Sequence, residues 1–233
     1  MTIPADVASR AADLGVVLEA PDLGRLDAYL THLLETNEKF NLTAVRDEAE
    51  AWERHILGSL TLVGPLASAA SRDVADVGSG GGLPGIPLAI CLPDVRFTLI
   101  EATGKKANFL RDCVERLGLA NVSIVQERAE TIGQDHHQFR ERFDAVMARA
   151  VGPLRVLLEL TVPLAKVGGV VIAIKGEKAE AEIADAKSAL HALHAAHAQT
   201  IAAPTGRLVI IEKLRKTPRM YPRSPGEPKR KPL

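Results

Sequence analysis

The sequence has few aromatic residues, few cysteines and no long apolar run. Trp, Tyr and Phe make up only 3% of the 233 residues, although hydrophobic residues reach 46%, so aliphatic side chains and alanine must form most of the core. Two cysteines, Cys91 and Cys113, are too few for a disulfide framework. There is no run of 18 or more apolar residues and no apolar stretch typical of a secretory signal, so we expect a cytoplasmic protein without a membrane span.

The sequence also lacks net charge, because 29 basic residues balance 29 acidic ones. The charges are nevertheless unevenly placed. Residues 213–233 hold eight basic residues and one acid, a net charge of +7, so residues 1–212 carry −7. A basic segment on an acidic body suits a polyanionic partner, with a solvated terminus as the alternative interpretation. Five prolines after Thr217 predict that the tail, defined here as residues 216–233, is extended rather than helical.

Helical periodicity dominates residues 1–66, and strands alternate with helices over residues 67–215. Asp22 is the predicted N-cap of a second helix, and a third helix is predicted to start near Asp47. The predicted strands span 73–77, 95–100, 122–126, 143–148, 168–174, 196–201 and 207–214, with helices at 84–92, 103–117, 153–165 and 177–195. Only about five residues separate the last two strands, which predicts an antiparallel hairpin at one sheet edge. The sequence therefore predicts an α/β, Rossmann-like domain with a seven-stranded sheet, preceded by a helical extension.

A glycine-rich turn follows the first predicted strand. Gly78, Gly80 and Gly82 would lie at the carboxyl ends of the strands, where doubly wound sheets bind ligands. Glu101 closes the second strand 23 positions after Gly78, a spacing at which an acid can accept hydrogen bonds from ribose hydroxyls. The segment ERAE at 127–130 follows the third strand, where a backbone amide and a carboxylate could meet an adenine edge. These features favour a ligand built on adenosine. The turn has no GK[ST], so it is not a Walker phosphate loop.

Two adenosine cofactors fit this turn. Residues 80–85 match GxGxxG, which is typical of dinucleotide binding, but counted from Gly78 the pattern is GxGxG. Asp76, two residues before that glycine, could meet the ammonium group of S-adenosylmethionine, whereas it would repel the pyrophosphate of NAD. The sequence thus favours S-adenosylmethionine, and an NAD(P)-dependent oxidoreductase remains the alternative.

Five segments carry a resemblance to a known family. They are NLTAVRD (41–47), ERHIL (53–57), DVGSGGGLPGIPLAI (76–90), KKANFL (105–110) and TPRMYPRSPGEPKRKPL (217–233). Together they resemble the small-subunit ribosomal RNA methyltransferase G family, also called glucose-inhibited division protein B, from about residue 25 to the end of the chain. Gly58 is a departure, because the family has aspartate at that position.

The resemblance implies a class I methyltransferase that transfers a methyl group from S-adenosylmethionine to N7 of a guanine in the 530 loop of 16S rRNA. Its cofactor contacts would fall on Gly78, Leu83, Ala129, Glu130 and Arg149. We also assign Arg149 a catalytic role, because it ends the fourth strand at the mouth of the site. There it can hold the cofactor carboxylate or an RNA phosphate, or stack on the guanine. The expected partner is 16S rRNA or the small ribosomal subunit, bound by a monomeric enzyme.

The remaining residues agree with this chemistry. Guanine N7 is an unprotonated lone pair, so its methylation needs positioning rather than a base. No NPPY-type loop follows the fourth strand, and neither cysteine lies at a strand end. We expect RNA contacts from Lys175, at the end of the fifth strand, and from Arg219 and Arg223 in the tail. We expect no metal, because no cysteine or acid pattern completes a zinc site. An RNA-binding or ribosome-assembly factor without activity is a second alternative.

Overall fold

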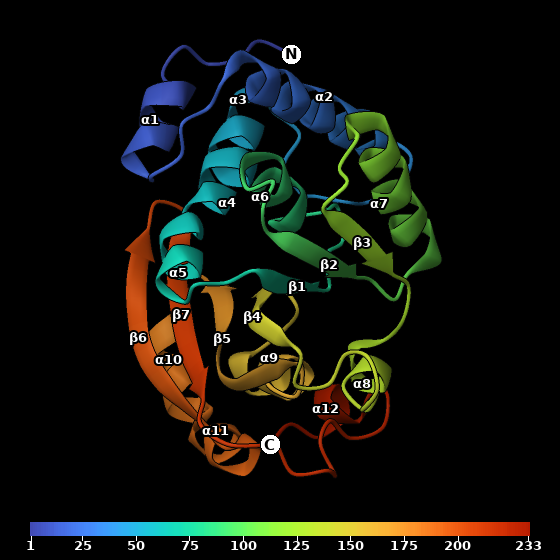
Figure 1. Cartoon of the computed structure of the whole chain (residues 1–233), viewed down its shortest axis with the longest axis vertical. Coiled ribbons are helices and arrows are strands. Elements are labelled where there is room, and N and C mark those ends of the chain that lie inside the picture. The colour runs from blue at the N-terminus through green and yellow to red at the C-terminus, as the bar shows by residue number, and fades with distance from the viewer.

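The computed structural model describes all residues, 1–233, and shows a central sheet with helices on both faces (Figure 1). The strands are β1 (Asp73–Val77), β2 (Arg96–Ile100), β3 (Val122–Val125), β4 (Phe143–Arg149), β5 (Ala165–Lys175), β6 (Ala195–Ala203) and β7 (Gly206–Lys213). Their order is β3-β2-β1-β4-β5-β7-β6. The first five strands are parallel, and β7 is antiparallel to both β5 and β6. The predicted seven-stranded sheet and its edge hairpin are confirmed.

The helices before the sheet are α1 (Val7–Asp13), α2 (Ala20–Asn37), α3 (Glu48–Ala51), the π-helix η1 (Trp52–Leu57), α4 (Gly58–Leu60) and α5 (Val63–Ser68). Those that follow β1 are α6 (Gly85–Cys91), α7 (Gly104–Leu117), α8 (Ala129–Ile132), α9 (Leu154–Thr161), α10 (Ala179–Asp185), α11 (Lys187–Leu193) and α12 (Glu227–Arg230). In Figure 1, α2, α6 and α7 lie on one side of the sheet, and α9 to α11 lie on the other. None of the helices is long and apolar enough to cross a membrane.

Side chains that alternate between the two faces of the sheet form two separate hydrophobic cores. Val74 of β1 belongs to a cluster of 34 buried residues shared with the N-terminal helices, α6 and α7, whereas Ala75 belongs to a cluster of 24 shared with α8 to α11. Successive side chains of a strand point to opposite faces, so a sheet covered on both faces needs apolar residues at nearly every position. The N-terminal helices are therefore part of the main core.

Two predictions about the first helices have different outcomes. Asp47 does cap α3, since its carboxylate accepts the Glu50 amide at 2.8 Å. Asp22 is not the N-cap of α2. The helix begins earlier, after Glu19, and Asp22 forms the other half of a capping box with it.

Three segments differ from the sequence-based prediction. Strand β5 starts at Ala165 rather than 168, and its pairing with β4 contains an irregularity in the stretch where Gly168 has φ +78°. The single helix predicted over 177–195 is two helices, α10 and α11, separated at Ala186. The tail is not purely extended, since residues 227–230 form the short helix α12 and the tail packs against α9.

Candidate cofactor and RNA site

The turn Gly78–Gly82 leaves β1 at the carboxyl end of the sheet, between β2 and β4. Gly78, Gly80 and Gly82 have φ angles of +73°, +55° and +88°, in the left-handed region that glycine reaches without steric cost. The amides of Gly78 and Ser79 both donate to the carbonyl of Ile100, at 2.9 and 3.2 Å. These bonds fix the turn to the end of β2.

The glycines of this turn lack side chains for two different reasons. A Cβ on Gly82 would lie 2.6 Å from Cγ1 of Ile86, and one on Gly78 would lie 2.9 Å from Cγ2 of Val151, so packing requires both glycines. A Cβ on Gly80 would meet nothing closer than the Gly78 carbonyl oxygen, at 3.8 Å. The space beside Gly80 is therefore open, which fits a ligand that lies on the backbone.

Glu101 connects this turn to the start of α7. One carboxylate oxygen accepts the Gly80 amide at 2.9 Å, and the other accepts the Thr103 amide at 2.7 Å. The residue is only 7% exposed. Because a carboxylate has about four lone-pair sites, two backbone bonds leave acceptor capacity for a diol such as a ribose. Glu101 thus shapes the turn and presents acceptors beside Gly80.

Asp76 lies beneath the turn and is fully buried. Its Oδ2 accepts the Gly85 amide at 3.1 Å, and its Oδ1 has no hydrogen-bond partner. Burial raises the pKa of this carboxyl group to about 7, against the opposing effects of hydrogen bonds and of Arg149. A buried acceptor without a partner is costly, so an added cationic or donor group at this point would stabilise Asp76 in its charged form.

Arg149 ends β4 next to the turn, and its half-buried side chain faces the N-terminal helices. Nη1 donates to the carbonyl of Arg54 in η1 through a long hydrogen bond of 3.3 Å. Burial and, to a smaller extent, the charges of Arg149 and Arg54 together lower the pKa of His55 to about 4. The π-helix therefore places a neutral histidine and one cation, Arg54, beside Arg149 at the end of β4.

The N-terminal helices also hold the glycine turn directly. The hydroxyl of Tyr29 in α2 donates to the carbonyl of Gly81 at 2.7 Å, and Tyr29 is fully buried. Sequence reasoning missed this contact, because nothing local to Tyr29 distinguishes it from an ordinary core residue. It shows that the helical extension helps to build the site.

The three other predicted cofactor residues, Leu83, Ala129 and Glu130, are buried. Leu83 and Ala129 have exposed fractions of 8% and 9%, with their side chains packed into the two cores. The Glu130 carboxylate accepts hydrogen bonds from Arg128 and from the Gly226 amide of the tail. Residues 127–130 can therefore offer a ligand backbone groups, while the Glu130 side chain is committed to the tail.

The three predicted RNA contacts are not equivalent. Lys175 is 8% exposed at its side chain and pairs with Glu182 at 2.6 Å, and the Arg223 side chain is 15% exposed and pairs with Glu159 at 2.6 Å. Both are occupied by structural ion pairs. Arg219 is exposed, and its carbonyl accepts a bond from Gln134. Of the three, Arg219 alone presents a side chain to solvent.

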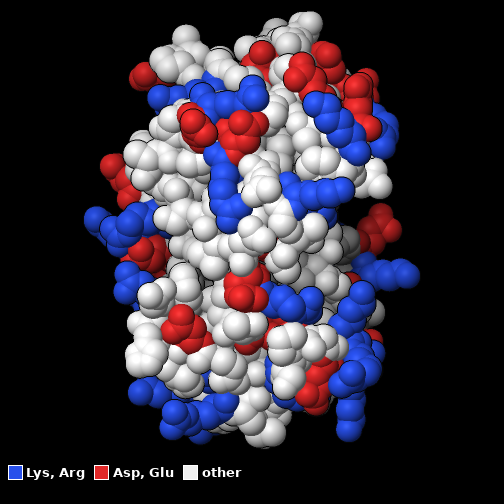
Figure 2. All heavy atoms as spheres, turned by 90° about the vertical axis from the view of Figure 1, so that its right-hand side faces the viewer, with Lys and Arg blue, Asp and Glu red and all other residues white.

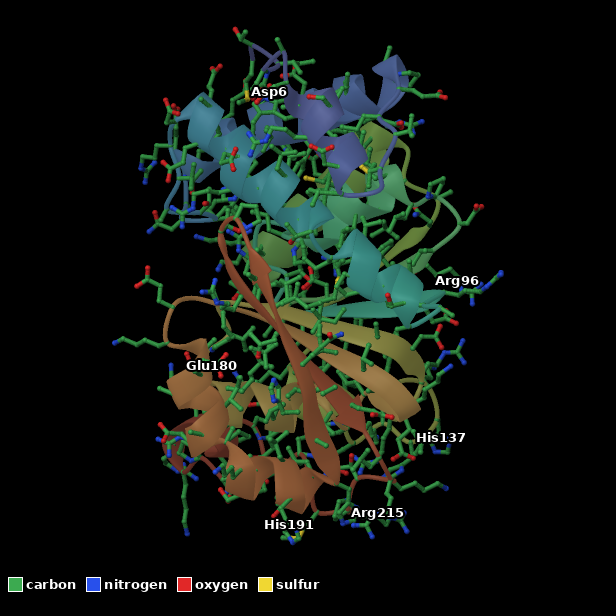
Figure 3. The ribbon with its side chains drawn as sticks, turned by 90° about the vertical axis from the view of Figure 1, so that its left-hand side faces the viewer. Asp6, Arg96, His137, Glu180, His191 and Arg215 are labelled. Atoms are coloured by element: carbon green, nitrogen blue, oxygen red, sulfur yellow. The ribbon has the colours of Figure 1, made fainter.

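The exposed basic residues of the C-terminal segment form two groups. In Figure 3, Arg215 lies toward the side of Arg96, where β2 begins, and Glu180, which follows β5, lies on the opposite side. The first group, Arg215 and its neighbour Lys216, therefore sits near the amino ends of the parallel strands. The second group is Lys229, Arg230 and Lys231, at the end of the chain. Figure 2 shows Lys and Arg side chains spread over the face that carries α7, β3 and α8, with Asp and Glu side chains among them.

A groove opens at the carboxyl end of the sheet, lined in part by Arg54, whose carbonyl accepts the hydrogen bond from Arg149. It has a volume of about 500 Å³ and separates η1 from the tip of the β6–β7 hairpin. Its lining includes Glu53, Arg54, Gly176, Glu177, Thr205 and Arg207. At Gly58 a Cβ would lie 3.1 Å from the Thr205 hydroxyl, so a small residue there lets the hairpin tip approach the N-terminal helices. No group of three or more metal-binding side chains occurs in the structure.

Comparisons with known proteins converge on one family. The sequence model of the family described as "rRNA small subunit methyltransferase G" matches residues 22–210. A protein of Sorangium cellulosum with the name ribosomal RNA small subunit methyltransferase G is 47% identical over 223 residues, covering 95% of this chain and 92% of its own. A protein of the same name from Pelotomaculum thermopropionicum is 40% identical, covering 96% and 95%.

Solved structures show the same fold at low sequence identity. An O-methyltransferase from Bacillus cereus in complex with SAH has a TM-score of 0.55 and 18% identity, covering 88% of this chain and 94% of its own. A putative O-methyltransferase from Klebsiella pneumoniae has a TM-score of 0.56 and 13% identity, covering 80% and 90%. The predicted class I methyltransferase fold is thereby confirmed.

Proposed function

Because the chain belongs to the rRNA small subunit methyltransferase G family, we propose that it methylates N7 of a guanine in the 530 loop of 16S rRNA. The family and the fold confirm the resemblance and the predicted cofactor, S-adenosylmethionine. They also disfavour the NAD(P)-dependent oxidoreductase. The choice of base and atom rests on the resemblance in sequence. We also propose that the enzyme is a monomer and that it acts in the cytoplasm.

The observation that carries the proposal is the open turn at Gly80, held between Glu101 and Tyr29. In this arrangement Glu101 would accept hydrogen bonds from the ribose hydroxyls of the cofactor, and the unpartnered oxygen of Asp76 would meet its ammonium group. Main-chain groups of residues 127–130 would lie along the edge of the adenine. The bound cofactor supplies an electrophilic methyl group on a sulfonium centre.

The residues of the chain then need only orient the base, because N7 carries a lone pair and no proton. Arg149, which ends the strand next to the turn, would contact the cofactor carboxylate or a phosphate of the RNA. The groove between η1 and the hairpin tip is lined by Arg54, the hydrogen-bond partner of Arg149, and would admit the target nucleotide. We include the exposed Arg219 in the proposed RNA surface, but not Lys175 or Arg223, whose charges are already paired.

Primer extension tests this function on 16S rRNA from cells with and without the protein, after reduction and strand cleavage at 7-methylguanine. We expect a stop in the 530 loop that disappears without the protein and returns with the wild-type chain but not with Arg149→Met. Methyl transfer from labelled S-adenosylmethionine to free 16S rRNA and to small subunits identifies the substrate form. A protein that binds RNA but transfers no methyl group to either would support the alternative of an inactive assembly factor.

A further inference from the structure

The tail is docked on the domain by an ion pair that is largely buried. Arg223 donates to Glu159 of α9 through its amide, Nε and Nη2, at 2.8, 2.8 and 2.6 Å. Glu159 has no exposed surface. A charge buried in this way requires its partner, because an unpaired buried carboxylate is strongly destabilising. Arg223 therefore fixes the path of the tail over α9.

A second attachment surrounds the end of α8. The guanidinium of Arg140 donates to the carbonyls of Gly133, Thr217 and Tyr221, at 2.6, 2.9 and 2.7 Å. A Cβ on Gly133 would lie 2.6 Å from the ring of Pro222, so the proline packs directly on the glycine. The tail thus contacts the main chain just after α8 without any gap.

The docked tail also contacts a predicted cofactor residue, Glu130. The Gly226 amide donates to Oε1 of Glu130 at 2.8 Å, and Arg128 donates to the same oxygen at 2.7 Å. Although burial alone would raise it, these hydrogen bonds lower the pKa of Glu130 below its usual value. Arg128 and Glu130 belong to the segment after β3, one strand from Glu101. The tail and the adenine side of the proposed site therefore share one carboxylate.

We propose that the docked tail is a positioning element of the cofactor site, holding residues 127–130 in the conformation that binds S-adenosylmethionine through Gly226 and Glu130. This inference rests on the proposed cofactor-dependent function. It assigns the tail a role that does not depend on its exposed positive charges. Tail docking and cofactor binding must then favour each other by the same factor, because linkage between two binding equilibria is reciprocal.

Two variants separate docking from charge. Gly133→Val puts a branched side chain against Pro222 without changing any charge, and Gly64→Ala is its matched control, because a Cβ on Gly64 meets nothing within 4 Å. Replacing Lys229, Arg230 and Lys231 with Gln removes exposed charge and leaves the Glu130 and Glu159 contacts in place. Cofactor affinity is measured by calorimetry with S-adenosylhomocysteine on the full-length proteins. Hydrogen exchange of residues 223–230 is measured with and without that ligand.

For Gly133→Val we expect cofactor affinity to fall about 5- to 150-fold, the usual range of coupling between sites, and the KM for S-adenosylmethionine to rise more than kcat falls. The triple Gln variant and Gly64→Ala should keep wild-type affinity. In the wild type, S-adenosylhomocysteine should slow exchange of the tail amides. If Gly133→Val releases the tail in the exchange experiment yet binds the cofactor normally, the proposal is wrong. The proposal is also wrong if S-adenosylhomocysteine leaves the exchange rate of the wild-type tail amides unchanged. A wild-type protein that binds no cofactor would instead refute the proposed function.

Discussion

Substitution of Gly80 by alanine tests whether the cofactor lies on the glycine turn. A Cβ at this position projects into open space, so the folded protein itself has little steric reason to reject it. The left-handed φ of +55° costs alanine about 1–2 kcal/mol. That cost should lower the Tm by a few degrees for a chain of this length. The added methyl group would occupy the position of the ligand, and we expect cofactor affinity to fall about 10- to 100-fold, or about 1.4–2.8 kcal/mol.

Gly118→Ala is the matched control for this experiment. Gly118 ends α7 with φ +63° and has no atom within 4 Å of a built Cβ, so alanine there meets the same backbone strain away from the turn. Calorimetry with S-adenosylhomocysteine and thermal unfolding are measured on both variants. Similar losses of stability with a loss of affinity at Gly80 alone would support the placement. Equal cofactor affinity in the two variants would refute it.

Three further predictions concern the site and its surroundings. Glu101→Gln replaces one carboxylate oxygen by an amide NH2 that faces a backbone amide, and cofactor affinity measured by calorimetry should fall by about 1–2 kcal/mol. The folded-state pKa of His55, about 4, is below its ordinary value of 6.5, so the unfolded chain binds more protons between these pH values. Acidification from pH 6.5 to 4 should therefore lower the free energy of unfolding more for the wild type than for His55→Gln. Urea unfolding of both proteins across this pH range measures the difference. Replacing Lys229, Arg230 and Lys231 with Gln should reduce the slope of log RNA affinity against log salt by about 2 on a single strand, and an unchanged slope would exclude these residues from the RNA surface.

The strands and the position of the turn were predictable, because both depend on local patterns. Apolar runs such as that ending at Val77 are long enough for a buried parallel strand, and the glycines after it mark the end. The contacts that complete the site were not predictable. Tyr29 reaches Gly81 across 52 positions, and Arg140 reaches Tyr221 across 81. Neither side chain differs locally from an ordinary core tyrosine or a surface arginine, so only the folded chain reveals their partners.

The charge of the tail illustrates the same limit. Counting basic residues correctly identifies a strongly positive segment, but it cannot separate the cations that are paired from those that face solvent. Arg223 forms an ion pair with Glu159. Lys213, just before the tail, is fully buried and contacts Glu141 and the Ala165 carbonyl. The residues available to RNA are therefore fewer than the sequence count indicates.

The order of the last three strands has a consequence for folding. Strand β6 pairs only with β7, and β7 alone joins it to β5. During synthesis β6 leaves the ribosome first but cannot enter the sheet until β7 has followed, so the two strands should form their hairpin before it docks. A chain that stops before Gly206 would leave the edge of β5 unpaired, with Val171, Ile172 and Ala173 at its centre. Exposed apolar edges of this kind associate with one another. A stop codon shortly before Gly206 should therefore yield aggregates rather than a folded but inactive enzyme.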